Sequence, residues 1–508
     1  MEFTHLVATS EAVASTPGRS AKVAALAALL AGVAPGEREV AAAMLAGEVR
    51  QGRIGVGWAT LAALGPTPAE APELTIADVD EVLSRLDGLV GAGSVAARQE
   101  VLTDLLARCT RPEADYLRRL LLGEVRQGAL AGLVTDAVAR AAGVPVDAVR
   151  RAAMLTGDLG RTAGLALGGG AAALAAVHLE VLRPVLPMLA ATAADVATAV
   201  GELGTSSVEW KLDGARVQAH RRGDEVRLFT RNLNDVTARL PRVDAVVRSL
   251  PVRDVILDGE VVGLGDDDRP DRFQDTMSRF GSHDGSGASL RVAFFDILHL
   301  DGTDLLDRPL VDRLDALERV AAAWRVRNVV TADADVAAEF LAGALAAGHE
   351  GVMVKAIGSA YDAGRRGAAW RKVKPVRTLD LVVLAAEWGH GRRRGRLSNL
   401  HLGARDPHGG FVMVGKTFKG LTDELLAWQT DRLLELAVTS SDHVVEVRPE
   451  LVVEIALDGV QVSRRYPGGV ALRFARVRRY RDDKASADAD TIDAVRALLV
   501  PGGADRPG

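Results

Sequence analysis

The chain has almost no cysteine. Its 508 residues include a single one, Cys109, which excludes an intramolecular disulfide and any zinc site built from several cysteines. Long apolar runs are also lacking, because no stretch reaches the ~18 apolar residues that would span a membrane. The first residues, Met1 to His5, do not show the basic and then apolar order of a signal peptide. These absences together predict a protein of a reducing cytoplasm with no membrane partner.

A large excess of one charge is lacking as well. The formal net charge of −5 argues against a general nucleic-acid binder, but the basic residues are unevenly spread. Gly364 to Arg377 holds six basic residues and no acidic one, and Ser463 to Lys484 holds eight basic residues against two aspartates. A third basic run is Arg392 to Arg396. Such runs are often only solvated surface, but three of them in an acidic chain favour a phosphate-rich partner.

The composition is that of a globular protein with several cores. Hydrophobic residues make up 48% of the chain and charged residues 25%, as in ordinary folded proteins. A chain of 508 residues is too long for one ordinary domain, so we expect about three.

Residues 1–195 have the pattern of a helical domain. Val23 to Leu30, for example, are strong helix formers with apolar residues three and four positions apart. The region also repeats itself, since Gly-Glu-Val-Arg-Gln-Gly occurs at both 47–52 and 123–128. The repeat predicts duplicated helical units that each end at a glycine turn. Its apolar positions are explained by packing, whereas Arg50 and Arg126 are candidates for contact with a partner.

The texture changes to strands from about residue 205. Alternating residues over Val208 to Arg222 and over Val226 to Arg231, around Gly223-Asp224, predict a hairpin. Shorter strand-like runs follow, separated by helical stretches at 312–324 and 334–347. We predict a mixed α/β domain over 205–375. Several short strands over 376–508, interrupted by a helix at Leu421 to Leu436, suit a small barrel of the OB type.

Lys211 lies in a Lys-x-Asp-Gly-x-Arg pattern that ends at Arg216. A lysine attacks phosphorus only as the neutral amine, and free lysine is almost wholly charged at pH 7. A nucleophilic lysine therefore needs burial or neighbouring positive charge. Two more lysines, Lys372 and Lys374, stand far along the chain. If the fold brings all three together, the site holds three cations and suits a triphosphate.

Four further motifs follow this pattern in order. They are Asp258-Gly259-Glu260 after a buried strand, Phe294-Phe295-Asp296 in another strand, Glu350 to Lys355, and the arginine-rich run from Arg473 to Lys484. Each alone has an ordinary structural explanation, such as a turn, a core aromatic residue, a helix end or a solvated surface. Their joint order is much harder to explain in that way.

In that order the motifs resemble the covalent nucleotidyltransferase superfamily. The chain is similar to ATP-dependent DNA ligases of the three-domain kind, over nearly its whole length. The most specific parts are 209–231, Glu350 to Lys355 and Arg481 to Lys484. The resemblance implies a helical DNA-binding domain at 1–195, a nucleotidyltransferase (adenylation) domain at 205–375 and an OB-fold domain at 376–508. Thr156 to Gly160 and Arg183 to Leu189 are similar to the DNA-binding domain of that family.

The resemblance also implies a role for each motif residue. Lys211 takes AMP, and Glu350 binds the divalent metal, with Glu260 as a second carboxylate. The implied nucleotide contacts are Glu209 and Trp370 at the base, Phe295 stacked on it, Arg216 and Glu260 at the ribose, Arg231, Lys372 and Lys374 at phosphate, and Arg481 and Lys484 at the leaving pyrophosphate.

The implied reaction seals a nick in duplex DNA with ATP and Mg²⁺. AMP passes from Lys211 to a 5′-phosphate, and a neighbouring 3′-hydroxyl then displaces it. Magnesium suits this chemistry because it is bound by one or two carboxylates plus phosphate oxygens of the substrate. The expected form is a monomer, associated with the nucleoid if the source is bacterial. Arg50 and Arg126 would contact the duplex, while 205–508 would hold all the chemistry.

Three other interpretations compete with this one. A GTP-dependent RNA capping enzyme or an RNA ligase shares the Lys-x-Asp-Gly core, but the helical N-terminal part disfavours both. An NAD-dependent ligase carries a zinc-binding cysteine cluster that is absent here. A nucleic-acid-binding protein with a decayed catalytic site would have lost Lys211, Glu350 or Lys374, and all three are present.

Overall fold

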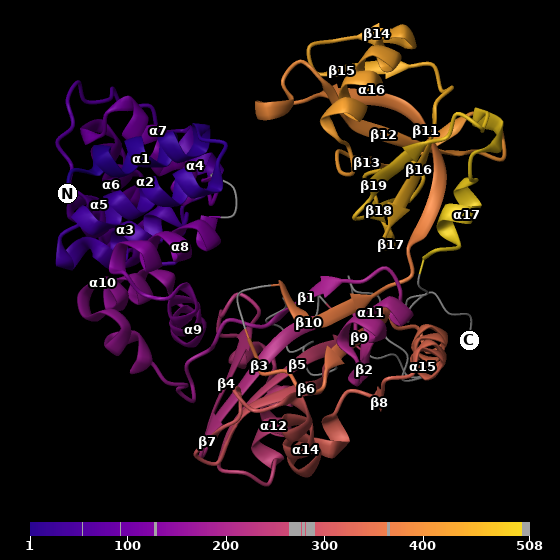
Figure 1. The fold of residues 1–508 in the computed structure, drawn as a ribbon. Coiled ribbons are helices and arrows are strands. Elements are labelled where there is room, and N and C mark those ends of the chain that lie inside the picture. The colour runs from indigo at the N-terminus through magenta and orange to yellow at the C-terminus, as the bar shows by residue number, and fades with distance from the viewer. Residues whose placement is uncertain are drawn as a thin grey trace.

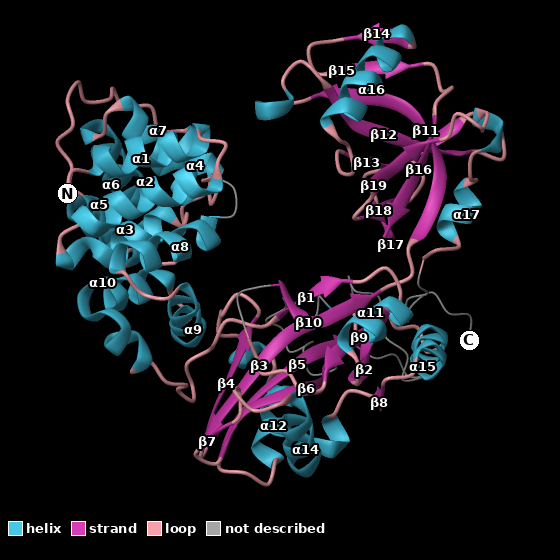
Figure 2. Cartoon of the chain, in the orientation of Figure 1, coloured by secondary structure: helices cyan, strands magenta, loops and turns pink. Residues whose placement is uncertain are grey.

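The chain folds into three parts. The computed structural model describes residues 1–52, 54–91, 93–125, 130–263, 276, 280, 290–362 and 366–499. A helical N-terminal part and a strand-rich C-terminal part each adjoin a central part that holds two sheets (Figure 1). Figure 2 shows that helices dominate the first part and strands the other two. No helix in the described ranges is long and apolar enough to cross a membrane.

The N-terminal part packs its helices around one apolar core. The helices are α1 (Phe3–Ser15), α2 (Arg19–Gly32), α3 (Arg38–Leu45), α4 (Trp58–Ala62), α5 (Ile76–Asp87), α6 (Ser94–Arg108), α7 (Arg111–Leu121), α8 (Leu130–Ala142), α9 (Val146–Thr156) and α10 (Leu159–Ala175). Fully buried side chains such as Phe3, Leu30 and Leu117 come from well-separated helices and form a continuous cluster. The expected helical domain is confirmed for these residues.

The two sequence repeats form matching helix ends. α3 is followed by Gly47 at φ 79° and α7 by Gly123 at φ 67°, a left-handed conformation that glycine adopts without a steric penalty. The N–H of Gly47 donates to Met44 O at 2.9 Å, and that of Gly123 donates to Leu120 O at 3.1 Å. A glycine turn therefore follows each of the two helices, whereas Gly128, the last residue of the second repeat, lies outside the described residues.

The central part contains two five-stranded sheets. The first has the order β1-β10-β9-β2-β8, with β1 (Leu189–Thr192), β10 (Arg366–Val373), β9 (Gly351–Ala356), β2 (Ser206–Lys211) and β8 (Asn328–Thr331). The second has the order β4-β3-β5-β6-β7, with β4 (Glu225–Thr230), β3 (Ala215–Arg222), β5 (Asp254–Gly263), β6 (Leu290–Leu300) and β7 (Thr303–Asp304). Helices α11 (Val196–Leu203) and α15 (Ala334–Ala346) cover the first sheet, and α12 (Pro241–Ser249) and α14 (Leu310–Ala321) cover the second.

The expected strand over Val208 to Arg222 is wrong in one respect. The β3–β4 hairpin with its turn at Gly223-Asp224 is present, but β2 belongs to the other sheet. The chain crosses between the sheets at Leu212 to Gly214. Gly214 lies so close to β5 that a Cβ there would be 2.2 Å from the carbonyl oxygen of Val261. Asp213 and Gly214 therefore lie where the chain passes from one sheet to the other. The alternation of apolar and polar residues could not predict this crossing.

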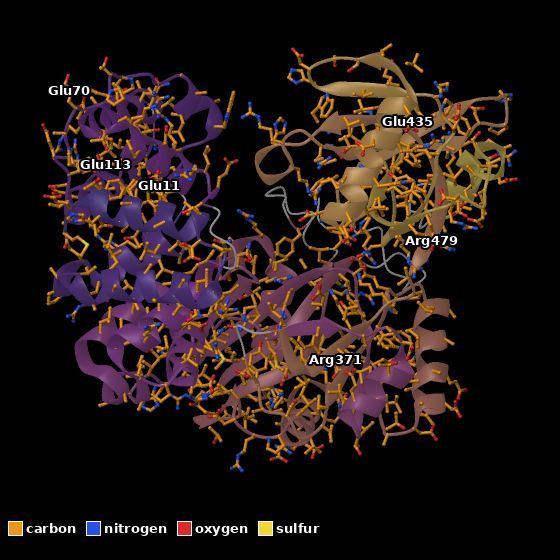
Figure 3. The ribbon with its side chains drawn as sticks, turned by 45° about the horizontal axis from the view of Figure 1, so that its top comes forward. Glu11, Glu70, Glu113, Arg371, Glu435 and Arg479 are labelled. Atoms are coloured by element: carbon orange, nitrogen blue, oxygen red, sulfur yellow. The ribbon has the colours of Figure 1, made fainter. Side chains whose placement is uncertain are left out.

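The last residues of the range 1–195 make contacts with the central part. β1, inside the range assigned to the helical domain, pairs in parallel with β10 of the central sheet. Arg371 of β10, labelled in Figure 3, pairs with Glu202 of α11, with 2.9 Å between Nε and Oε2. Residues 189–203 therefore pack with the central part, because their apolar side chains complete the core of its first sheet.

The C-terminal part is a sheet domain. Its strands are β11 (Arg377–Trp388), β12 (Leu397–Arg405), β13 (Phe411–Thr417), β14 (Ala437–Ser440), β15 (Val444–Val447), β16 (Val452–Leu457), β17 (Gly459–Val462), β18 (Val470–Arg473) and β19 (Arg476–Tyr480). The order β13-β12-β11-β15-β14, with β16 joined to β11 and β19, does not close on itself among the described residues. The fold is consistent with an OB domain, and α16 (Asp423–Glu435) confirms the predicted helical insertion. A short helix, α17 (Ile492–Arg496), follows the last strand.

Candidate active site

A cavity of about 760 Å³ lies between the two central sheets, and residues of the C-terminal part also line it. Nine residues singled out from the sequence line this cavity: Glu209, Lys211, Arg216, Arg231, Glu260, Phe295, Trp370, Lys372 and Lys374. They come from motifs up to about 160 positions apart in the chain, so only the tertiary structure brings them into one cavity.

Strand geometry explains why the motif residues of the first sheet converge. Glu209 and Lys211 are two apart on β2, as are Trp370 and Lys372 on β10, so each pair faces one side of the sheet. β9 lies between these strands, with Lys355 opposite Trp370. Three neighbouring strands therefore present their polar residues to one cavity.

Glu350 joins the expected nucleophile, Lys211, to Lys374, one of the two lysines expected at phosphate. Its Oε2 contacts the Nζ of Lys211 and lies 2.6 Å from the Nζ of Lys374. Burial opposes ionisation of the Glu350 carboxyl, but the two ammonium groups outweigh it and hold its pKa below the usual value. Gly351 permits this close approach, because a Cβ there would be 2.2 Å from Val373 O.

Glu209 forms a buried pair with Lys355, a residue to which sequence reasoning gave no role. The Lys355 Nζ lies 2.6 Å from Glu209 Oε2, and both side chains are almost fully buried. Burial raises the pKa of Glu209, and Lys355 opposes that rise. The same ammonium lies over the rings of Phe295, 4.4 Å from its centroid, and Trp370, 4.2 Å from its centroid. Lys355 lies two residues from Met353 on β9, and Met353 also lines the cavity. Alternation along this strand could therefore have identified Lys355 as a cavity residue.

Arg216 is held by a buried carboxylate that sequence reasoning left without a role. The guanidinium donates to both oxygens of Asp258, at 3.0 Å from Nε and 2.6 Å from Nη2. It also donates from Nη1 to Met188 O at 2.7 Å. The hydroxyl of Tyr361 donates to Asp258 at 2.7 Å. Planar bidentate pairing of this kind fixes the orientation of an arginine.

Glu260 faces the same cavity from β5. Burial raises the pKa of its carboxyl to about 7, although Lys211 and Arg216 favour the ionised form. Its carboxylate accepts a hydrogen bond from the backbone N–H of Gly214. A group that titrates near neutrality can gain full charge when a cation arrives.

The C-terminal part supplies cavity residues to which sequence reasoning gave no role. Lys419, Asp458, Phe474 and Arg476 line the cavity, and Asp458 Oδ2 lies 3.7 Å from the Nζ of Lys374. No motif identified Asp458, because it lies between β16 and β17 and reaches the cavity only through domain placement.

Comparison with known proteins identifies the family. A model of the ATP dependent DNA ligase domain matches residues 187–374, and models of the DNA ligase N terminus and C terminal region match 63–139 and 393–484. A probable DNA ligase of Rhodococcus jostii (strain RHA1) is 56% identical over 501 residues, which cover 98% of this chain and 100% of that protein. The chain belongs to the ATP-dependent DNA ligase family.

A second relative agrees with this assignment, and a solved structure agrees with the fold. A probable DNA ligase of Mycolicibacterium paratuberculosis (strain ATCC BAA-968 / K-10) is 59% identical over 504 residues, covering 97% of each chain. A solved structure titled Pmar-Lig_PreS3 matches 94% of this chain and 99% of its own, with a TM-score of 0.64 and 19% identity, which supports the fold.

Two residues expected at the pyrophosphate of the ligase reaction lie outside the cavity. Arg481 Nη1 and Lys484 Nζ both pair with Asp380 Oδ2, at 2.9 Å and 2.6 Å. Arg481 also pairs with Asp483, at 2.6 Å. In this structure Asp380 and Asp483 bind these cations. The expected role of Arg481 and Lys484 at pyrophosphate stays a prediction.

Of the two arginines expected to contact DNA, the structure describes only Arg50. Arg50 is paired with Asp80, whose carboxylate lies 2.6 Å from Nη2, although about half of the arginine side chain is exposed. The neighbouring Gln51 donates to the same carboxylate at 2.8 Å. The Arg-Gln end of the first repeat therefore has a structural role as well. Arg126 lies outside the described residues.

The carboxylates near the cavity are of the kind that can hold a magnesium ion together with phosphate oxygens. No group of three or more His, Cys, Asp or Glu side chains that could bind a metal occurs within the described part of the chain. Magnesium does not require one, because phosphate oxygens usually supply ligands beside one or two carboxylates. Glu350 and Glu260 meet that requirement. The buried Nε1 of Trp370 has no hydrogen-bond partner among the described residues, which leaves one donor for a bound ligand.

Proposed function

We propose that this chain is an ATP-dependent DNA ligase that seals nicks between a 3′-hydroxyl and a 5′-phosphate. It would work through a lysine–AMP and then an AMP–DNA intermediate. The observation that supports this proposal best is the position of Lys211, which shares the Glu350 carboxylate with Lys374 inside the cavity. A lysine with a second cation and a carboxylate beside it suits attack on a phosphate that carries a metal.

In the first step, Lys211 Nζ attacks the α-phosphorus of ATP. A nitrogen–phosphorus bond forms, and the bond from that phosphorus to the bridging oxygen of pyrophosphate breaks. Negative charge develops on the equatorial oxygens, where Lys372, Lys374 and Arg231 line the cavity. Before it attacks, Lys211 must separate from Glu350 and give one Nζ proton to solvent water.

The rest of the nucleotide would occupy the part of the cavity between the sheets. Phe295 and Trp370 suit the faces and edge of a purine, and Glu209 offers a carboxylate to its amino group. Arg216 and Glu260 suit the ribose hydroxyls, because both point into the cavity from neighbouring strands. Glu350 and Glu260 would hold Mg²⁺, which neutralises phosphate charge when bound.

The later steps require DNA. AMP moves from Lys211 to the 5′-phosphate, and the 3′-hydroxyl displaces it to form the phosphodiester bond. We propose that the helical part, assigned to residues 1–195, grips the duplex on both sides of the nick. Arg50 and Arg126 would contact phosphates there. The part over 376–508 would act as an OB domain, with Arg481 and Lys484 orienting pyrophosphate, and the protein would work as a monomer.

The direct test is transfer of label from ATP to the protein. Wild-type protein incubated with Mg²⁺ and ATP labelled at the α-phosphate should carry label through denaturing electrophoresis and should seal a nicked duplex. Lys211→Ala should carry no label and seal nothing, because the nitrogen that forms the bond to phosphorus is gone. Lys22→Ala, which removes a lysine of the helical part, serves as the matched control and should behave as wild type.

Two results would contradict the proposal. Label that survives on Lys211→Ala would show that another residue is the nucleophile. Label from GTP but not from ATP would place the chain with the capping enzymes.

A further inference from the structure

β3 carries a stripe of polar side chains opposite its apolar face. Val217 and Ala219 point into the core of the second sheet. Arg216, Gln218, His220 and Arg222 occupy the alternate positions and point the other way. Gln218 and His220 are almost completely buried, at 5% and 0% exposure. Their polar atoms must therefore find partners inside the protein.

Those partners are backbone groups of residues 181–188, which we call the connecting segment. The Gln218 side chain holds both backbone groups of Val185: its Oε1 accepts from the N–H at 2.8 Å, and its Nε2 donates to the carbonyl at 3.3 Å. His220 Nδ1 accepts from the N–H of Leu182 at 3.0 Å. Gln218 and His220 thus bind the backbone of the connecting segment, which pairs with no strand, in the way that a neighbouring strand would.

The hydrogen bonds of His220 agree with a neutral ring in one tautomer. Burial, with a smaller effect of His299, lowers the pKa of His220 to about 3. Because Nδ1 accepts, the proton is on Nε2, which lies 2.8 Å from Gln218 Oε1. The N–H that His220 accepts belongs to Leu182, whose φ of 76° is unusual for a residue with a side chain. A bond at that position helps to hold an unfavourable backbone conformation.

The two ends of the stripe differ in what they touch. At the far end, Arg222 Nη2 donates to Val181 O at 2.7 Å. At the cavity end, Arg216 Nη1 donates to Met188 O at 2.7 Å, while the Met188 N–H donates to Tyr361 Oη at 3.1 Å. Met188 itself lines the cavity. The connecting segment therefore runs along β3 and ends as a wall of the proposed nucleotide site.

We propose that Gln218 and His220 are positioning residues for the nucleotide. By holding the connecting segment against β3, they keep the Met188 peptide where it can hold Arg216 and shape the cavity wall. The proposal rests on the proposed adenylylation reaction and adds two residues that do not touch the nucleotide. The segment is also tied to the helical part, since the N–H of Leu186 donates to Met154 O at 3.0 Å.

The test is a comparison of nucleotide binding and turnover in substitutions along the stripe. Gln218→Leu and His220→Leu keep the volume and remove the hydrogen bonds to the segment. We expect each to raise the KM for ATP in multiple-turnover nick sealing about tenfold, with kcat changed less than about threefold, as expected for the loss of one or two hydrogen bonds. The Kd for a non-hydrolysable ATP analogue, measured by calorimetry, should rise by a similar factor.

Two further variants separate positioning from a general loss of stability. His220→Asn keeps an acceptor near the place of Nδ1 for the Leu182 N–H, so its KM should lie closer to wild type than that of His220→Leu. Arg222→Ala removes the bond farthest from the cavity and should leave the KM unchanged. Thermal unfolding of every variant measures stability alongside, and the His220 pair decides the question if Gln218→Leu does not fold.

The proposal is overturned by any of three results in folded variants. These are an unchanged KM and analogue Kd, a loss confined to kcat, or an effect of Arg222→Ala as large as that of the central variants. Failure of the proposed function has a different signature, because wild-type protein would then carry no label from ATP.

Discussion

Buried polar residues carry most of the information in this molecule at the scale of single side chains. Glu209 pairs with Lys355, and Arg216 pairs with Asp258, away from bulk water. Such pairs are costly to break, because removal of one partner leaves a buried charge without compensation. Glu209, Lys355 and Arg216 all line the cavity, so these pairs fix the side chains that shape it.

His220 makes a pH-dependent contribution that can be measured. Its pKa is lowered by burial to about 3 in the folded protein, against about 6.5 for an exposed histidine. The unfolded chain therefore binds the extra proton between these values, so stability is full above about pH 6.5 and falls as the pH decreases toward about 3. Between about pH 7.5 and about pH 5.5 the loss from this group should be about 1.4 kcal/mol.

The measurement compares the free energy of unfolding of wild type and His220→Asn at both pH values. The other titrating groups are common to the two proteins, so the variant should lose less stability on acidification. An equal loss would show that His220 is not the group responsible.

At the scale of elements, the position of β19 limits how the role of the C-terminal cations can be tested. β19 pairs with β16, and Val477 belongs to the C-terminal core, so truncation before Arg476 would remove part of the sheet. Destabilisation would then mask any effect on chemistry. Substitution of the two cations beyond the strand avoids this problem.

Arg481→Ala with Lys484→Ala should separate the steps of the reaction. We expect self-adenylylation from ATP to fall by roughly tenfold or more, because the cations proposed to orient pyrophosphate are gone. Sealing of a nick that already carries AMP should change far less. Asp380→Asn is the matched control, since it removes the carboxylate that both cations contact but keeps the cations. Equal loss in self-adenylylation and in sealing of the nick that carries AMP would assign the pair to DNA binding or stability.

At the scale of the whole molecule, the connecting segment and β1 decide where the chain can be cut. A protein beginning at Glu180 keeps the segment and the β1 strand, whereas one beginning at Thr205 loses Met188 and an edge strand of the first sheet. We expect the 180–508 protein to form the AMP adduct and the 205–508 protein to form little or none.

The 180–508 protein should still bind nicked duplex much more weakly than the full chain. Sealing should fail as salt rises, because contacts with phosphate release counterions and are sensitive to ionic strength. If this protein seals as well as the full chain across a salt series, the helical part is not a DNA clamp.

The sequence by itself determined the family, the order of the parts and nine of the residues that line the cavity. Local patterns carry this information: alternation places Glu209 with Lys211 and Trp370 with Lys372 on common faces, and repeated glycines end the matched helices. These features depend on a few neighbouring residues, so they can be read without the fold.

Only the tertiary structure decided the crossing of the chain between two sheets at Leu212 to Gly214, and the place of β1 in the central sheet. It also revealed the partners Lys355, Asp258 and Asp458. Pairing between strands far apart in the chain, and contact between separate parts, depend on long-range packing that no local pattern encodes. A strand of given alternation fits either sheet equally well, and the packing of apolar faces then selects one.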